Sequence, residues 1–97
     1  MHPMVSIDPT VEIVVSGKVQ GVFYRQSARE KALELGLRGY VENMANGNVR
    51  LIVTGPDDKL EALYQWCRVG PPKAEVKGIT KTTIPVMRVF EGFEIKK

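Results

Sequence analysis

Cysteine and histidine are almost missing from this chain of 97 residues, which has only Cys67 and His2. With one cysteine the chain cannot form an internal disulfide or a thiolate metal site, and we expect a reducing, cytoplasmic location. A Ser-His-Asp triad, a Cys-His pair or a multi-histidine zinc site would have to use His2, so we set these classes aside. No apolar run approaches the roughly 20 residues of a membrane helix, and we see no signal-peptide pattern.

The composition is that of an ordinary globular domain, with 43% hydrophobic and 26% charged residues. A chain of this length forms one hydrophobic core. We expect residues 1–10, which show no periodicity, to be a flexible N-terminal tail, and residues 11–97 to be the domain. The net charge of +3 suits an anionic ligand but is too small to indicate nucleic acid.

The first helix is predicted from Val22 onward by an apolar stripe that runs from Tyr24 to Leu35, and Gly36 favours a helix end. Ser27 and Glu30 also have the spacing of a capping box, which allows a later start. We prefer the earlier start because the stripe reaches back to Tyr24.

The second helix is predicted to open at Asp57 or Asp58, and Asp58 and Glu61 have the spacing of a capping box. Gly70 and the prolines after it stop this helix. The side chains that we expect it to bury are Leu60, Leu63, Trp66 and Cys67.

Strands are predicted on both sides of each helix. Gly78 interrupts one of them and indicates a β-bulge. The order β-α-β-β-α-β-β predicts an α+β protein, a ferredoxin-like βαββαβ sandwich. Its antiparallel or mixed sheet carries two helices on one face and an extra C-terminal strand. The expected strands are Val11–Ser16, Leu37–Met44, Val49–Thr54, Ala74–Thr83 and Phe90–Lys96.

The turn after the second strand decides where Asn43 points. A two-residue turn at Asn46-Gly47 would place the apolar residues of the two flanking strands on opposite faces. A three-residue loop, Ala45 to Gly47, puts them on one face, with Gly47 at the left-handed bulge position. This register predicts that Asn43 faces the helices.

The loop from Gly17 to Gly21 precedes the first helix and suits an anion. Its glycines allow backbone amides to converge, and no capping side chain satisfies the first helical N–H groups. Arg25 near the first turn opposes the helix dipole unless an anion lies nearby. The crossover helix makes the first two strands parallel, so this loop and Asn43 reach the same sheet edge across a gap of roughly 10 Å.

The segment Gly17-Lys18-Val19-Gln20-Gly21-Val22-Phe23-Tyr24-Arg25 closely resembles the signature loop of the acylphosphatases. Gly39-Tyr40-Val41-Glu42-Asn43, followed by Gly47-Asn48-Val49, resembles their second signature. The likeness covers about residues 11 to 97 and departs from the family pattern at Tyr40, Asn46 and Lys97.

The resemblance implies hydrolysis of the carboxyl-phosphate bond of acyl phosphates. It implies that Arg25 and loop amides bind the phosphate and that Asn43 orients the attacking water. It also implies a small-molecule acyl phosphate as substrate, inorganic phosphate as product, and no metal or other cofactor. We expect a monomer with no membrane or nucleic-acid partner. The amides are those of Val19, Gln20, Gly21, Val22, Phe23, Tyr24 and Arg25.

Two other classes of protein stay open. An RNA-binding module has the same element order, and Arg38-Gly39-Tyr40-Val41 begins like its RNP1 motif. That motif belongs on the third strand, whereas this segment lies on the second. The other alternative is a non-catalytic phosphate-binding or anion-binding module of ferredoxin-like fold, but binding alone does not require a residue such as Asn43.

Overall fold

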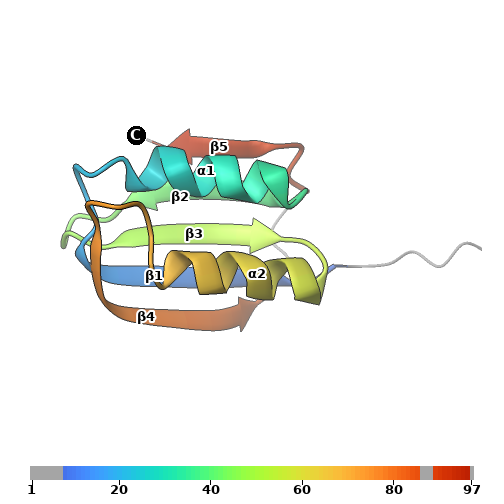
Figure 1. Ribbon diagram of the computed structural model, residues 1–97. Helices are drawn as coiled ribbons and strands as arrows, with labels where there is room; N and C mark the ends of the chain where they lie inside the picture. Colours follow the sequence, from blue (N-terminus) through green and yellow to red (C-terminus); the bar gives the residue numbers. More distant parts are fainter. Residues whose placement is uncertain (1–7, 86–88, 97) are drawn as a thin grey trace, which may run out of the picture.

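The computed structural model describes residues 8–85 and 89–96. They form one five-stranded sheet in the order β4-β1-β3-β2-β5, with both helices on one face (Figure 1). The strand pairs are antiparallel except β2 and β5, which run parallel. The predicted ferredoxin-like βαββαβ sandwich with an extra C-terminal strand is therefore confirmed. The elements are β1 (Thr10–Lys18), α1 (Tyr24–Glu34), β2 (Arg38–Asn43), β3 (Val49–Thr54), α2 (Asp57–Cys67), β4 (Glu75–Ile84) and β5 (Phe93–Lys96).

The hydrophobic core lies between the sheet and the helices. Alternate residues of β1 are buried because successive side chains of a strand point to opposite faces. The stripe predicted on α1 is buried at Tyr24, Ala28 and Ala32. Burial raises the pKa of the Cys67 thiol to about 12, so this cysteine is a protonated packing residue of α2. Leu60 and Leu63 are buried beside it, whereas Trp66 is only partly buried.

The hairpin from β2 to β3 has the three-residue loop that the sequence predicts. Asn43 pairs with Val49, and the Met44 amide donates to the Asn48 carbonyl at 2.8 Å. Gly47 has a φ of 96°, in the left-handed region that this loop requires. Asn43 therefore lies on the same face of β2 as the buried Val41, which is the face that the helices cover.

The predicted bulge is also present. Ser16 pairs with Gly78 and Gly17 pairs with Val76, so Lys77 is the extra residue of β4. A side chain at Gly17 would collide with the carbonyl oxygen of Glu75, 2.2 Å from the position of its Cβ atom. The bulge thus brings β4 close to β1 just before the loop that leads to α1.

Strand β1 begins one residue earlier than predicted. Thr10 is the first residue of β1, and its hydroxyl is hydrogen-bonded to that of Thr54 at 2.7 Å. Asp8 forms an ion pair with Arg38 at 3.2 Å. Residues 1–7, which make up most of the predicted tail and include His2, lie outside the described residues, as does Lys97.

Helix α2 opens at Asp57, as predicted, but its cap and the start of β5 differ from the prediction. The capping box from Asp58 to Glu61 is wrong, because α2 follows Pro56 directly and Asp58 lies inside the first turn. Strand β5 begins at Phe93 rather than Phe90, since its pairing with β2 starts at Gly39 and Phe93. Neither difference alters the face on which Asn43 or α1 lies.

Candidate active site

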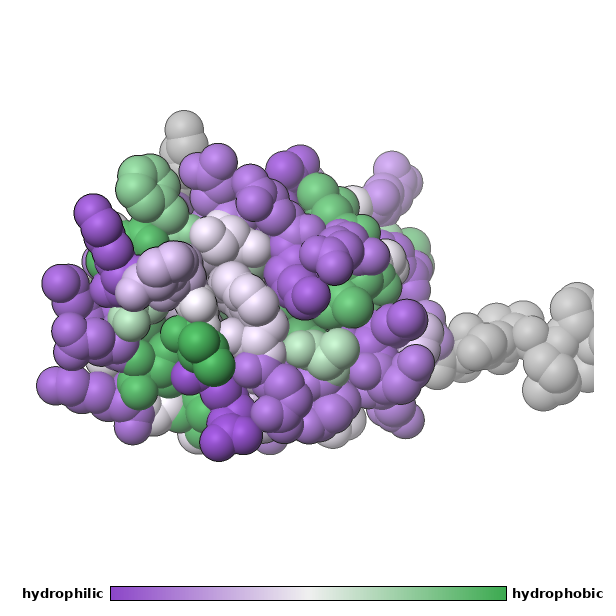
Figure 2. Space-filling view, viewed as in Figure 1, coloured by the Kyte–Doolittle hydropathy of each residue, from purple (hydrophilic) through white to green (hydrophobic). Residues whose placement is uncertain are grey.

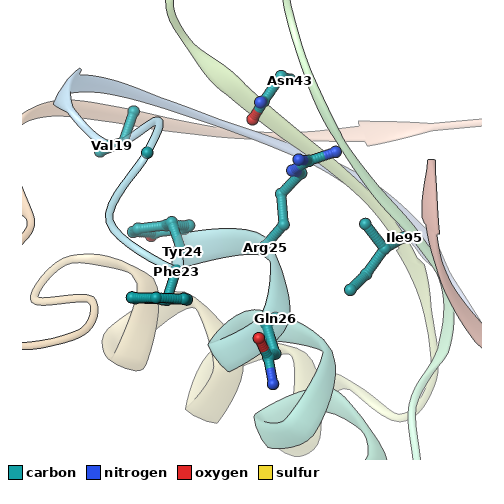
Figure 3. Close-up of a pocket in the computed structure, with 8 residues that line it drawn as sticks. Val19, Phe23, Tyr24, Arg25, Gln26, Asn43 and Ile95 are labelled. Carbon is teal, nitrogen blue, oxygen red and sulfur yellow. The ribbon is translucent and has the colours of Figure 1, made fainter. Parts of the chain in front are cut away.

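A cavity lies where β1 and β2 end. Both strands pair antiparallel with β3, so they run parallel to one another and end at the same edge of the sheet. The cavity has a volume of about 330 Å³ and is lined by residues of the β1–α1 loop and of α1, by Asn43 and by Ile95 of β5. Figure 3 shows the guanidinium of Arg25 and the amide of Asn43 close to one another in this pocket. The predicted convergence of Arg25 and Asn43 is confirmed.

The β1–α1 loop contains two left-handed residues, a feature of anion nests. Gly21 has a φ of 75° and Phe23 a φ of 63°, so both are left-handed. Left-handed residues among right-handed ones turn successive N–H groups to one side, which favours an anion. Of the expected phosphate-binding positions, the pocket is lined by Val19, Gly21, Phe23, Tyr24 and Arg25, but not by Gln20 or Val22. The role of the amides stays a prediction.

Helix α1 leaves its N-terminal N–H groups without a side-chain cap. It begins at Tyr24, two residues after the predicted start, and its first turn has no acidic residue. The Ser27 amide already donates to the Phe23 carbonyl at 3.0 Å, so the alternative start at Ser27 is wrong. The uncapped N–H groups, the helix dipole and the charge of Arg25 together favour an anion at this end.

Strand β5 holds the Arg25 side chain. The Arg25 Nη1 atom donates to the main-chain oxygen of Lys96, in β5, at 2.8 Å. The C-terminal lysines look like a solvated end in the sequence, and Lys96 is exposed, yet its main-chain oxygen contacts Arg25. Its ammonium group lies 4.2 Å from the centre of the Tyr40 ring, which also packs edge-on against Phe90. Lys96 is missed from the sequence because its contact with Arg25 depends on the pairing of β5 with β2.

Gln20 is a second residue whose side chain the sequence does not identify as part of the site. Its Nε2 atom donates to the main-chain oxygens of Met44 at 2.9 Å and Asn48 at 2.8 Å. These carbonyls lie on the two sides of the β2–β3 loop, and Met44 directly follows Asn43. The Gln20 amide therefore ties the β1–α1 loop to the strand end that carries Asn43. The only signal in the sequence is a polar side chain between two glycines.

Tyr24 fixes the start of α1 to the end of α2. Its hydroxyl donates to the Cys67 carbonyl at 2.7 Å, and its ring centre lies 5.5 Å from that of Trp66. Burial raises the pKa of the Tyr24 phenol far above its usual range, so the group stays protonated and keeps donating. Tyr24 lines the pocket as a packing residue, as expected.

The rest of the described surface is largely hydrophilic on the face that Figure 2 shows. Within residues 8–85 and 89–96, no three His, Cys, Asp or Glu side chains come together as a metal site. In the same part of the chain, neither helix has the length and apolar character needed to cross a bilayer.

Comparison with known proteins matches most of the chain to an established family. The acylphosphatase family model matches residues 11–95, a range that includes both the loop and Asn43. The chain is 45% identical over 85 residues to an acylphosphatase of Methylococcus capsulatus, covering 88% of this chain and 92% of that protein. A solved acylphosphatase from Coxiella burnetii has a TM-score of 0.87 at 39% identity, covering 93% of this chain and 94% of that chain. One from Bacillus subtilis has a TM-score of 0.88 at 28% identity, covering 92% and 99% of the two chains.

Proposed function

The chain belongs to the acylphosphatase family, and we propose that Arg25 and Asn43 carry out its reaction. The enzyme hydrolyses the carboxyl-phosphate bond of acyl phosphates to a carboxylate and inorganic phosphate. We assign these roles to Arg25 and Asn43 because both line one pocket at the end of β1 and β2.

Arg25 and the loop amides bind the phosphate group of the substrate. The uncapped start of α1 and the left-handed residues Gly21 and Phe23 offer N–H donors to its oxygens. Lys96 takes one nitrogen of the Arg25 guanidinium, which leaves the remaining donors for the phosphate. Phosphoryl transfer has a loose transition state with charge spread over three oxygens, so preorganised donors supply most of the catalysis.

Asn43 holds the attacking water. Its carboxamide has both donor and acceptor atoms, but it does not take a proton at neutral pH. The water oxygen forms a bond to phosphorus while the bond from phosphorus to the carboxyl oxygen breaks, and that electron pair leaves on the carboxylate. The proton of the water passes to an oxygen of the substrate's own phosphate group. A general base is therefore not required from the protein.

The leaving group explains why such a simple site suffices. A carboxylic acid has a pKa of about 4, so the carboxylate leaves without a protonated acid to assist it. We infer that turnover needs no metal or other cofactor. We also infer a cytoplasmic location from the single cysteine and no nucleic-acid partner from the small net charge of +3. A monomer with no membrane partner is our working expectation.

Hydrolysis of benzoyl phosphate in the presence of EDTA tests this proposal, with p-nitrophenyl phosphate as a stable-ester control. We expect fast cleavage of the acyl phosphate by the wild type, little cleavage by Asn43→Ala, and none of the ester by either. A folded protein that binds inorganic phosphate but cleaves nothing would instead be an anion-binding module. Loss of activity in EDTA, restored by a divalent metal, would contradict the metal-free mechanism.

A further inference from the structure

In-line displacement fixes where the acyl group must lie in the pocket. The attacking water and the leaving carboxylate occupy opposite sides of phosphorus in the transition state. If Asn43 holds the water, as proposed above, the acyl group points to the side of the phosphate that is remote from Asn43.

Phe23 is an aromatic residue of the pocket that lies away from Asn43. Figure 3 shows Asn43 on one side of the Arg25 side chain, and Phe23 and Gln26 on the other. All four residues line the same pocket. The Phe23 side chain is 74% exposed, so its ring is available to a ligand and adds little to the hydrophobic core.

The backbone at Phe23 does not explain why this residue is aromatic. Within the described residues, Phe23 is the one non-glycine residue with a positive φ, 63°. Glycine or asparagine adopts this conformation at lower cost, and a bulky residue there is strained. Strain of this kind is concentrated at functional sites. The exposed ring lines the pocket and is therefore free to contact a ligand there.

We infer that Phe23 forms the floor of an acyl-group subsite, with Gln26 at its border, and that this subsite selects flat apolar acyl groups over acetyl. The inference rests on the proposed roles of Arg25 and Asn43. An aromatic acyl group stacks on the Phe23 ring or meets it edge-on, whereas an acetyl group has too little surface to do so. The substrate class is therefore an acyl phosphate whose carboxyl group carries an apolar ring or a similar flat group.

Binding of two non-hydrolysable ketophosphonates tests the subsite without turnover. Phenacylphosphonate and acetonylphosphonate carry the benzoyl and acetyl groups with a methylene in place of the bridging oxygen. By isothermal titration calorimetry, we expect the wild type to bind the phenacyl compound about tenfold more tightly. Phe23→Ala keeps a Cβ atom and therefore the strain of the positive φ at this position. This variant should bind both compounds equally. Phe23→Trp keeps a ring and should retain the preference.

Val69→Ala is the matched control, because Val69 is 72% exposed and lies outside the pocket. It should leave the ratio of the two affinities unchanged. Equal affinities in the wild type, or an unchanged ratio in Phe23→Ala, would overturn the acyl subsite.

Measuring turnover of two substrates distinguishes a failure of the acyl subsite from a failure of the proposed hydrolysis. We expect Phe23→Ala to lower kcat/KM about tenfold for benzoyl phosphate and less than about twofold for acetyl phosphate. Equal losses for both substrates would overturn the subsite but leave the roles of Arg25 and Asn43 intact. A wild type that binds the phenacyl compound but hydrolyses neither substrate would refute the proposed function alone.

Discussion

The two helices of this domain have the same length, 11 residues, but opposite charges at their N-termini. Helix α2 follows Pro56 and has Asp57 and Asp58 in its first turn. Helix α1 follows the left-handed Phe23, has no acidic residue in its first turn, and has Arg25 there instead. Neither helix has a side-chain hydrogen bond at its N-cap.

On the proposed function, the difference separates a helix stabilised by its own first-turn carboxylates from one that serves a ligand. A carboxylate in the first turn stabilises a helix by about 0.3–1 kcal/mol, because it interacts favourably with the dipole. Helix α2 obtains this stabilisation from its own aspartates, whereas the first turn of α1 has no acidic residue, as the proposed binding of an external anion requires. The positive end of α1 faces the pocket that Arg25 and Asn43 line.

Removing the positive charge from α1 should have the largest effect. We expect Arg25→Ala to lower kcat/KM for benzoyl phosphate about a thousandfold or more, because the transition state loses its main cationic partner. Inhibition by inorganic phosphate should also disappear. Arg25→Lys keeps the charge but not the planar set of donors, so it should recover only part of the activity. Full activity in a folded Arg25→Ala protein would show that the start of α1 is not the phosphate site.

The contact that joins the two helices should matter for stability. Tyr24→Phe removes the hydroxyl that bonds the Cys67 carbonyl at the end of α2 and leaves that carbonyl without its donor. We expect the free energy of unfolding, measured with urea, to fall by about 1–2 kcal/mol. Tyr64→Phe on α2 is the control, since within residues 8–85 and 89–96 the Tyr64 hydroxyl has no hydrogen bond, and it should change stability by less than about 0.5 kcal/mol. Equal effects of the two changes would show that the Tyr24 hydroxyl has no special role.

An acidic residue in the first turn of α1 tests the difference in charge between the two helices directly. Gln26→Glu gives α1 the charge pattern of α2, so we expect its free energy of unfolding to rise by about 0.5 kcal/mol. The same carboxylate should weaken inhibition by inorganic phosphate about fivefold, because it repels the anion. Urea unfolding and inhibition kinetics measure the two effects on one variant.

The matched change in α2 is Asp58→Asn. It should lower the free energy of unfolding by about 0.5 kcal/mol and leave phosphate inhibition unchanged, because Asp58 lies outside the pocket. If both variants shift phosphate inhibition alike, the effect comes from net charge, and the contrast between the helices does not hold.

Much of the fold and part of the site could be predicted from the sequence. The period of Tyr24, Ala28 and Ala32 gave the buried face of α1, and the β2–β3 register followed from keeping apolar residues on one face. That register and the strand order predict that Asn43 lies beside the first loop. These inferences succeed because they depend on local periodicity and on a topology with few alternatives.

The missed features depend on contacts between distant segments. Arg25 is held by the Lys96 carbonyl, 71 residues away, and Gln20 by carbonyls 24 and 28 residues away. Every residue has a main-chain carbonyl, so the residue type does not reveal which carbonyl accepts a given hydrogen bond. The left-handed Phe23 was missed because the steric rule favours glycine or asparagine there.

The most direct test of the account is to measure turnover and phosphate affinity together in Asn43→Ala and Arg25→Ala. We predict that Asn43→Ala lowers kcat for benzoyl phosphate at least about a hundredfold while its inhibition constant for inorganic phosphate stays within about twofold of the wild type. Arg25→Ala should lose both. Equal loss of phosphate affinity in the two variants would contradict the division of labour between a binding arginine and a water-holding asparagine.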